Sequence, residues 1–337
     1  LVKEPDVYAA WADDEIRKQS SSGGVFSLIA GYILKNAGFV SGAVMDNETL
    51  SVNHIVSDNS DDISKMRASK YIQSCLNDCF EKIKQLLENN KPVLFTGTPC
   101  QCAGLKSFLG RNYKNLYIID ILSHSVPSGR VFRKFISGII DKDSIIKEID
   151  FRSKASIWAP EYLMTIKTDK KEYNITPDEN YFYKGFFSGL ISRKSCSKCI
   201  YSCLHREGDL TLGDFWHIKR QNKTLDDGLG TSLILVNNEK GAFLLNEIKK
   251  DLKLLKKMPL AAVTNLNLKK PSPKHKNRDL FFKNLDKLPL KDNIENCLYD
   301  KLDAAVINYW WAPSNYGAML TGYALQQILK EDRKSTR

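Results

Sequence analysis

Apolar residues along the first 250 positions fall into short runs with the periods of strands and helices. Strands are predicted where an apolar run of strand length is bounded by turn residues, at 39–45, 52–56, 92–95, 116–122, 210–212 and 232–236. Helices are predicted at 25–34, 105–109, 131–140, 181–187 and 239–250, and 145–176 has the pattern of further strands. The succession predicts an α/β fold with a mixed, partly parallel sheet, flanking helices and a cysteine-rich loop.

Two of the strand–loop–helix units place reactive side chains just after a strand. The strand at 92–95 runs into the turn that carries Cys100, and the strand at 116–122 runs into the loop that carries His124. The carboxyl ends of parallel strands lie at the same edge of a sheet, where α/β proteins bind their ligands. We therefore expect the cysteine turn and the His124 loop to share that edge.

The charge of the chain is concentrated in one segment. Between Lys249 and Lys291 there are thirteen Lys or Arg residues against three acidic ones, which accounts for most of the formal net charge of +11. The same stretch contains Pro259, Pro271 and Pro273 and few stacking aromatic residues, so it is interpreted as a solvated connection with no nucleic acid as partner. The expected organisation is a domain at 1–250, a basic linker at 251–301 and a truncated second α/β domain at 302–337.

Composition and length exclude several classes of protein. The chain of 337 residues is 42% hydrophobic and can bury a large core, so a scaffold held by disulfides is disfavoured. Its apolar runs are too short for a membrane span, and no charged-then-apolar leader is present. A cytoplasmic location is the expectation.

Three cysteines lie within eight residues, at Cys196, Cys199 and Cys203. Short loops between soft sulfur ligands can close around one metal centre, which points to an iron-sulfur cluster or to zinc. A second source of thiols is the turn that carries Cys100 and Cys102.

Seven ordered motifs resemble the coenzyme F420 hydrogenase/dehydrogenase beta subunit family over about residues 5–250. They are Ser-Ser-Gly-Gly at 21–24, Ser69-Lys70-Tyr71, Gly97-Thr98-Pro99-Cys100-Gln101, His124 with Val126-Pro127-Ser128, Phe151-Arg152-Ser153-Lys154, the pair Cys196 and Cys199, and Gly213-Asp214-Phe215-Trp216. The resemblance implies an oxidoreductase that holds FAD beside a 4Fe-4S cluster and passes electrons between them. It also implies an electron donor, such as a ferredoxin or ferredoxin-like module, and a small-molecule or sugar-linked substrate.

The resemblance carries roles to individual positions. FAD is expected against Ser22, Gly23, Gly24, Lys70, Thr98, Pro99 and Gln101, because glycine-rich helix starts suit a pyrophosphate. His124 and Lys70 are the candidate catalytic residues, and the candidate cluster ligands are Cys100, Cys196, Cys199 and Cys203. Ser123 stands where the family commonly has a cysteine ligand, so Cys203, or less favourably Cys102, has to replace it.

A second, shorter resemblance covers residues 303–330, which look like the opening strand and helix of polysaccharide pyruvyl transferases. It implies a role in the synthesis of cell-surface polysaccharide. A function of another class also stays open, namely a non-catalytic binding or scaffold module in which the cysteines hold zinc.

Overall fold

The structure is a computed structural model and describes residues 4–154, 163–263 and 266–299. The larger sheet contains β1 (Asp6–Trp11), β2 (Phe39–Asp46), β3 (Ser51–Ser57), β4 (Ser74–Cys75), β5 (Val93–Gly97), β6 (Leu116–Ile121), β10 (Leu210–Asp214), β11 (Ser232–Val236) and β12 (Leu254–Met258). A smaller sheet contains β7 (Ile146–Asp150), β8 (Met164–Thr168) and β9 (Glu172–Ile175). The α-helices are α1 (Asp14–Lys18), α2 (Val25–Lys35), α3 (Ser60–Met66), α4 (Cys79–Glu88), α5 (Pro99–Leu109), α6 (Gly129–Ser137), α7 (Tyr181–Phe187), α8 (Ile218–Gln221), α9 (Glu239–Ile248), α10 (Arg278–Asn284) and α11 (Leu290–Leu298). A short 3-10 helix, η1 (Lys194–Lys198), lies in the cysteine-rich stretch.

The larger sheet has the strand order β12-β1-β11-β10-β6-β5-β2-β3-β4. Its centre is parallel, since β2 pairs with β5, β5 with β6, and β6 with β10 in the same direction. The pairs β2–β3, β10–β11, β1–β11 and β1–β12 are antiparallel. The carboxyl ends of β5, β6 and β10 therefore open at one edge of the sheet.

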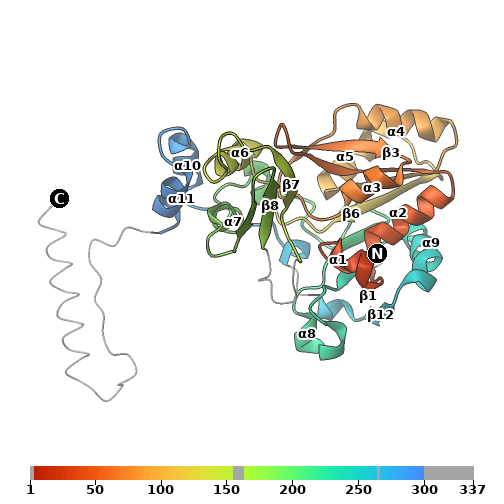
Figure 1. Ribbon diagram of the computed structural model, residues 1–337. Helices are drawn as coiled ribbons and strands as arrows, with labels where there is room; N and C mark the ends of the chain where they lie inside the picture. Colours follow the sequence, from red (N-terminus) through yellow and green to blue (C-terminus); the bar gives the residue numbers. More distant parts are fainter. Residues whose placement is uncertain (1–3, 155–162, 264–265, 300–337) are drawn as a thin grey trace, which may run out of the picture.

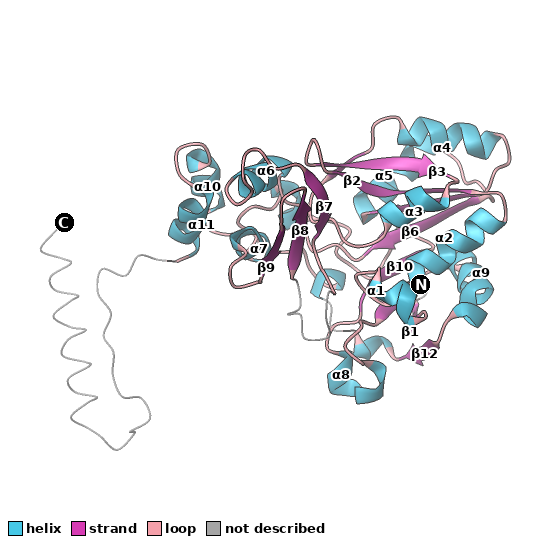
Figure 2. Ribbon diagram, in the orientation of Figure 1, coloured by secondary structure: helices cyan, strands magenta, loops and turns pink. Residues whose placement is uncertain are grey.

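Alternating side chains of the central strands bury both faces of this sheet. Leu94 and Ile119 face α2, α3 and α9, whereas Phe95 and Ile118 face α4 and α5. The helices thus cover the sheet on two sides, as Figure 2 shows. Apolar residues on both faces explain why the central strands read as continuous hydrophobic runs in the sequence.

The smaller sheet belongs to a second core. Phe132 and Phe135 of α6, Phe182 and Phe186 of α7, and Phe281 of α10 are buried together with apolar residues of β8 and α11. In Figure 1 this group of helices lies beside β7 and β8, at the opposite end of the described chain from α2 and α9. The expected mixed, partly parallel α/β fold with flanking helices is confirmed.

The segment 251–301 differs from the expected irregular connection. Its first part is β12, an edge strand whose Lys256 and Lys257 are exposed while Leu254 and Leu255 are half-buried. Lysines commonly occupy edge strands, where their charge opposes pairing with other chains, so a charge run here is compatible with a strand. Its last part forms α10 and α11, which pack into the second core.

Residues 302–337, for which a second domain was expected, lie outside the described residues. Of the helices that the structure does describe, none combines the length and the apolar character needed to cross a membrane.

Candidate functional site

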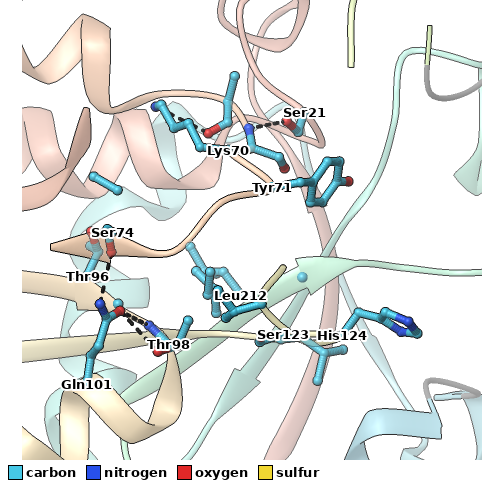
Figure 3. Close-up of a pocket in the computed structure, with 18 of the residues that line it drawn as sticks. Ser21, Lys70, Tyr71, Ser74, Thr96, Thr98, Gln101, Ser123, His124 and Leu212 are labelled. Carbon is cyan, nitrogen blue, oxygen red and sulfur yellow. Dashed lines mark hydrogen bonds between the residues drawn. The ribbon is translucent and has the colours of Figure 1, made fainter. Parts of the chain in front are cut away.

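A cavity of about 710 Å³ lies at the edge where β5, β6 and β10 end. Its wall includes Gly97 at the end of β5 and Thr98 just after it, Ser123 and His124 after β6, and Asp214 at the end of β10. Figure 3 shows Thr98, Ser123 and His124 on one side of this space and Lys70 and Tyr71 on the other. The cysteine turn and the His124 loop therefore share the edge, as expected, and the volume is within the roughly 300–1,000 Å³ of small-molecule sites.

The N-terminus of α2 opens into this cavity. Gly24 is the N-cap of the helix and lines the cavity together with Val25 and Phe26 of the first turn. No side chain of the described residues caps this turn; the Ser27 N–H donates to the Gly24 carbonyl oxygen at 3.1 Å, so the N–H groups of Val25 and Phe26 are the ones that could bind an anion. The hydroxyl of Ser22, also a lining residue, is buried without a hydrogen-bond partner among the described residues.

The two glycines before α2 are required by packing rather than by a ligand. A Cβ on Gly23 would lie 2.4 Å from the carbonyl oxygen of Ala10, and the Gly23 N–H donates to the Ser232 hydroxyl at 2.9 Å. Gly24 has φ +82°, and a Cβ there would lie 2.7 Å from Cγ2 of Ile16. Gly23 does not line the cavity, so its amide is committed to the fold and Gly24 alone of the pair borders the site.

The start of α5 is already capped by its own side chains. The Gln101 side-chain oxygen accepts from the Thr98 N–H at 2.9 Å and from the Thr98 hydroxyl at 3.0 Å. Its amide nitrogen donates to Ser74 at 2.9 Å, a bond drawn in Figure 3. Pro99 is buried and has no N–H to offer. Thr98 and Gln101 line the cavity but their polar groups are engaged, so α2 is the better anion site.

Lys70 lines the cavity but its ammonium group is held by the chain. It donates to the carbonyl oxygens of Lys65 at 2.8 Å, Arg67 at 2.5 Å and Ala68 at 3.4 Å, near the C-terminus of α3. Burial lowers the pKa of Lys70 to about 7. The Lys70 ammonium therefore caps carbonyl oxygens at the C-terminal end of α3. It can contact a phosphate, as expected, only if it gives up these hydrogen bonds.

Two arginines add positive charge to the cavity wall. Arg67 donates to the side-chain oxygen of Gln19, and Arg193 donates to that of Gln73 at 2.7 Å. Within the described part of the chain neither guanidinium pairs with a carboxylate, and Nε of Arg67 is buried without a partner. A cavity with two uncompensated guanidinium groups favours an anionic occupant.

His124 is fixed by a segment from much later in the chain. Asn267 Nδ2 donates to the His124 carbonyl oxygen at 3.2 Å, the Ser272 hydroxyl donates to the same oxygen, and Ser272 Oγ lies 3.3 Å from His124 Nδ1. The ring packs edge-on against Phe186 and Phe187, with centroids 5.3 and 5.9 Å away. Burial lowers the pKa of His124, a shift that an interaction with the Asn267 side chain opposes.

His54, a second histidine in the cavity wall, is also buried and also has one ring nitrogen without a hydrogen-bond partner among the described residues. Nε2 of His54 lies 2.9 Å from the Thr96 carbonyl oxygen, so this nitrogen carries the proton and Nδ1 is left as an acceptor. Nδ1 of His54 and Nε2 of His124 are buried without hydrogen-bond partners among the described residues. Burial also lowers the pKa of His54, which keeps the ring neutral at neutral pH.

Tyr71 lies between the cavity and the second core. Its ring is 5.7 Å from that of Tyr183 and 5.4 Å from that of Phe186, measured between centroids. Burial raises the pKa of Tyr71 to about 12, so its hydroxyl stays protonated. Tyr71, Phe186 and Phe187 line the cavity and give it an apolar, aromatic stretch of wall.

The candidate metal ligands come from two separate parts of the chain. Cys100 is exposed and lines the cavity, while Cys196 and Cys199 lie in the loop that follows Arg193. Burial raises the pKa of Cys196, and the nearby thiols of Cys100 and Cys199 raise it further. Cys100 and Cys199 therefore lie close enough to Cys196 to act on its thiol electrostatically.

The other two cysteines differ in their orientation. The Cys203 thiol donates to the carbonyl oxygens of Ile200 at 3.6 Å and His205 at 3.3 Å, within its own loop. Cys102 is fully buried in the core between α5 and the sheet. Among the described residues no group of three or more His, Cys, Asp or Glu side chains is arranged to hold a metal ion. The thiols are donors of the right type, but the ligand set is not closed around a metal.

Several lining residues were not singled out from the sequence. Arg67, Arg193 and Gln73 carry no local signature, and Asn267 comes from the segment interpreted as a linker. Tyr71 belongs to a motif that was recognised, but its place in the aromatic wall follows only from the packing of α7.

Comparisons with known proteins give a consistent picture. The sequence models of the coenzyme F420 hydrogenase/dehydrogenase beta subunit match the chain twice, the N-terminal model over residues 7–80 and the C-terminal model over 90–259. No curated protein matches the chain significantly. A solved structure titled as a xenon derivative of the F420-reducing [NiFe] hydrogenase complex from Methanosarcina barkeri contains a chain of similar fold. That similarity has a TM-score of 0.51 at 15% identity and covers 88% of this chain and 91% of the other.

The two family matches cover the central strands of the larger sheet and helices on both of its faces. They also contain the N-terminus of α2, the turn that carries Cys100, and His124. The chain belongs to the coenzyme F420 hydrogenase/dehydrogenase beta subunit family.

Proposed function

We propose that this chain is an iron-sulfur flavoprotein redox subunit that binds FAD in the cavity and passes electrons between FAD and a 4Fe-4S cluster. The observation that carries the proposal is the cavity itself. It combines an uncapped helix N-terminus at Gly24, the uncompensated cations Arg67 and Arg193, and an apolar aromatic end at Tyr71. A dinucleotide with a charged pyrophosphate and a flat aromatic ring presents the complementary groups.

The polar end of the cavity suits the pyrophosphate. The N–H groups of Val25 and Phe26 at the start of α2 and the positive end of its dipole favour negative charge. Arg67, which lines the same cavity and is bonded to Gln19 at the end of α1, supplies a charged donor. The buried hydroxyl of Ser22 is a further donor that has no partner in the described chain.

The apolar end suits the isoalloxazine ring, which exchanges two electrons as a hydride or one at a time when bound. We assign His124 to this end, because its ring lies against Phe186 and Phe187 and is held neutral by burial. A neutral imidazole there can hold or accept a proton beside the reacting ring. Lys70, whose pKa is about 7, can gain or lose a proton near neutral pH, but it reaches a bound flavin only if its ammonium exchanges its bonds to the carbonyl oxygens at the end of α3.

For the cluster we propose Cys100, Cys196 and Cys199 as ligands, with Cys203 as the fourth. Cys203 lies in the same loop and needs only to release its bonds to Ile200 and His205. Cys102 is the weaker candidate, since its thiol points into the core. In this proposal the electron acceptor is a small anionic molecule, because the cavity wall carries the cations Arg67 and Arg193. A link to polysaccharide synthesis depends on residues 303–330, which lie outside the described residues.

The binding of flavin is tested by titrating the protein, stripped of flavin, with FAD, FMN and riboflavin and following flavin fluorescence. Phosphate binding at α2 predicts that FAD and FMN bind at least about tenfold more tightly than riboflavin. Arg67→Met should remove most of that difference, whereas Arg111→Met, at an exposed arginine outside the cavity, should leave it unchanged. Equal affinities for all three flavins would reject the placement.

The cluster is tested by iron, sulfide and zinc assays on protein purified without oxygen. Stoichiometric iron and sulfide are expected, lost in Cys196→Ser and Cys199→Ser and reduced more by Cys203→Ser than by Cys102→Ser. Ser123→Cys should strengthen the cluster, because a thiolate is a better ligand than a hydroxyl. Stoichiometric zinc without iron or sulfide would instead favour the non-catalytic binding module.

A further inference from the structure

Asp214 is the only acidic residue among the described residues that line the cavity. It is the last residue of β10, and its side chain is 24% exposed. Arg67 and Arg193, by contrast, favour an anion in the same cavity. A carboxylate repels anions and accepts hydrogen bonds from hydroxyl and N–H groups, so Asp214 suits an uncharged part of the bound molecule.

Arg152 holds this carboxylate from outside the cavity. Its Nη1 donates to Asp214 Oδ2 at 2.5 Å, and its side chain is only 11% exposed. Its guanidinium carbon lies 5.9 Å from the centre of the Trp216 ring. Arg152 also interacts with the Tyr71 side chain, which opposes the rise in the Tyr71 pKa that burial causes. Asp214, Trp216 and Tyr71 all line the cavity whereas Arg152 does not, so one largely buried cation orients three side chains of the wall.

Contacts join Asp214 to both parts of the proposed flavin site. In the register of β10 and β11 it lies opposite Ser232, whose hydroxyl accepts from the N–H of Gly23 at 2.9 Å, directly before the N-cap of α2. Through Arg152 it is joined to Tyr71, a residue of the aromatic stretch of wall. Asp214 is therefore linked to the helix start proposed for the phosphate and to the aromatic residues proposed for the ring. In a flavin nucleotide these two groups are connected by the ribityl chain, which carries hydroxyl groups.

The carboxylate is held in place before any ligand binds. The segment that carries Arg152 is fixed at the start of α2, because Nζ of Lys154 donates to the Ser22 carbonyl oxygen at 3.1 Å. The backbone of Asp214 is fixed by the antiparallel pairing of β10 with β11. A group that is already oriented loses little conformational freedom on binding, which favours affinity and selectivity.

We propose that Asp214 recognises the hydroxyl groups of the ribityl chain of the flavin, and that Arg152 is the positioning residue that orients its carboxylate. This inference rests on the proposed binding of flavin in the cavity. An ionised carboxylate has about four lone-pair positions on its two oxygens, so it can accept from Arg152 and from ligand hydroxyl groups together. Such charge-assisted hydrogen bonds are stronger than those between neutral groups. The pairing with Arg152 also offsets the charge that would otherwise repel the phosphate.

The role of Asp214 is tested with riboflavin and lumiflavin, two neutral flavins with the same ring, of which lumiflavin has a methyl group in place of the ribityl chain. Each is titrated into the full chain, stripped of flavin, and flavin fluorescence is followed. The wild type should bind riboflavin at least about tenfold more tightly than lumiflavin, the factor that one charge-assisted hydrogen bond supplies. Asp214→Ala should reduce the affinity for riboflavin to that for lumiflavin and leave the latter unchanged. Neither flavin contains phosphate, so the comparison is independent of the anion site at α2.

Further variants separate this role from a general loss of stability. Asp214→Asn keeps the shape of the side chain and one acceptor oxygen, so it should weaken riboflavin binding less than Asp214→Ala does. Arg152→Met should lower the ratio of riboflavin to lumiflavin affinity by about fivefold or more, and Arg152→Lys should restore part of it, because an ammonium group can still donate to Asp214. The matched control is Asp227→Ala, which removes a carboxylate that also pairs with a buried arginine, Arg17, at 2.5 Å but does not line the cavity. It should leave the ratio unchanged.

The outcomes distinguish this inference from the proposed function. Equal affinities of the wild type for riboflavin and lumiflavin, or a ratio that both Asp214 variants leave unchanged, would overturn the role of Asp214. A ratio that Asp227→Ala lowers as much as Asp214→Ala would overturn it as well. If FAD and FMN still bind in these cases, the flavin site stands and only the recognition of the ribityl chain is rejected. If none of the four flavins binds to the wild type, the proposed function is rejected together with this inference.

Discussion

Asp120 anchors the loop of residues 193–205, which carries Cys196, Cys199 and Cys203. It forms a buried ion pair with Arg206, and Arg206 donates hydrogen bonds to backbone carbonyl oxygens of this loop. One carboxylate oxygen, Oδ1, accepts from Arg206 Nη2 at 2.6 Å and Nε at 3.2 Å. The other, Oδ2, accepts from the backbone N–H groups of Glu207 at 3.0 Å and Gly208 at 2.8 Å. Both oxygens are fully buried at the end of β6, so every acceptor position of the carboxylate is in use.

Asp120→Asn removes the charge and replaces one oxygen by a donor. The new NH₂ group must face either the Arg206 guanidinium or the two backbone N–H groups, which places donors against donors. Breaking one side of a buried ion pair typically costs about 3–5 kcal/mol, because the remaining charge stays buried without a counterion. We expect a loss of that size in the free energy of unfolding.

The control is Asp286→Asn, which breaks the pair between Arg130 and Asp286, whose side chains are 63% and 68% exposed. Exposed pairs contribute about 0–1 kcal/mol, so this variant should be nearly neutral. Both are measured by urea-induced unfolding at pH 7, and amide exchange across residues 201–208 should accelerate only in Asp120→Asn. The reasoning is refuted if Asp120→Asn costs no more than Asp286→Asn.

Three further outcomes are expected. Gly24→Ala should lower stability by about 1–3 kcal/mol in thermal unfolding because of its φ of +82° and the 2.7 Å approach to Ile16, whereas Gly31→Ala, with open space around it in α2, should be neutral or stabilising. Burial lowers the pKa of Lys154 to about 8, against about 10.4 in an unfolded chain, so the unfolded state binds more protons between these values. Stability should therefore rise with pH from about 8 to 10 in the wild type relative to Lys154→Met, and parallel curves would contradict this. The Ser272 hydroxyl gives its proton to the His124 carbonyl oxygen, so Nδ1 of His124 should carry the ring proton; nitrogen-15 NMR should show this tautomer in the wild type and in Ser272→Thr, and a mixture in Ser272→Ala.

The centre of the fold follows from local sequence patterns. The strands β2, β3, β5, β6, β10 and β11 and the helices α2, α5, α6, α7 and α9 were predicted because apolar runs, turns and caps act over a few residues, whereas α3 and α8 were not predicted. By contrast, β1 and β12 were not predicted. Each joins the sheet through a partner far away in the sequence, β1 lying between β11 and β12, and β12 consists largely of residues that also suit a charged connection.

The candidate site was predicted in outline but not in its detail. The motifs located the cavity, since Ser22, Gly24, Thr98 and His124 all line it. They did not reveal that the Gln101 side chain forms hydrogen bonds that cap α5, nor that the Lys70 ammonium donates to carbonyl oxygens at the end of α3. A residue type permits such hydrogen bonds but does not determine which of them form.

Residues beyond the family match complete the wall of the site. The match ends at residue 259, yet Asn267 lines the cavity and Ser272 is bonded to His124. The carbonyl oxygen of Pro273 would lie 2.2 Å from a Cβ on Gly189, so this segment also fits closely against the end of α7. A truncation at residue 259 would therefore remove part of the cavity wall although it preserves every family motif.

Cys100 connects the two halves of the proposed chemistry. Of the four candidate ligands it alone lines the cavity, and its thiol is close enough to that of Cys196 to raise the pKa of the latter. It lies in the first turn of α5, whose position is set by the bond from Gln101 to Ser74 in β4. In the proposed function Cys100 therefore borders both the flavin cavity and the cluster site.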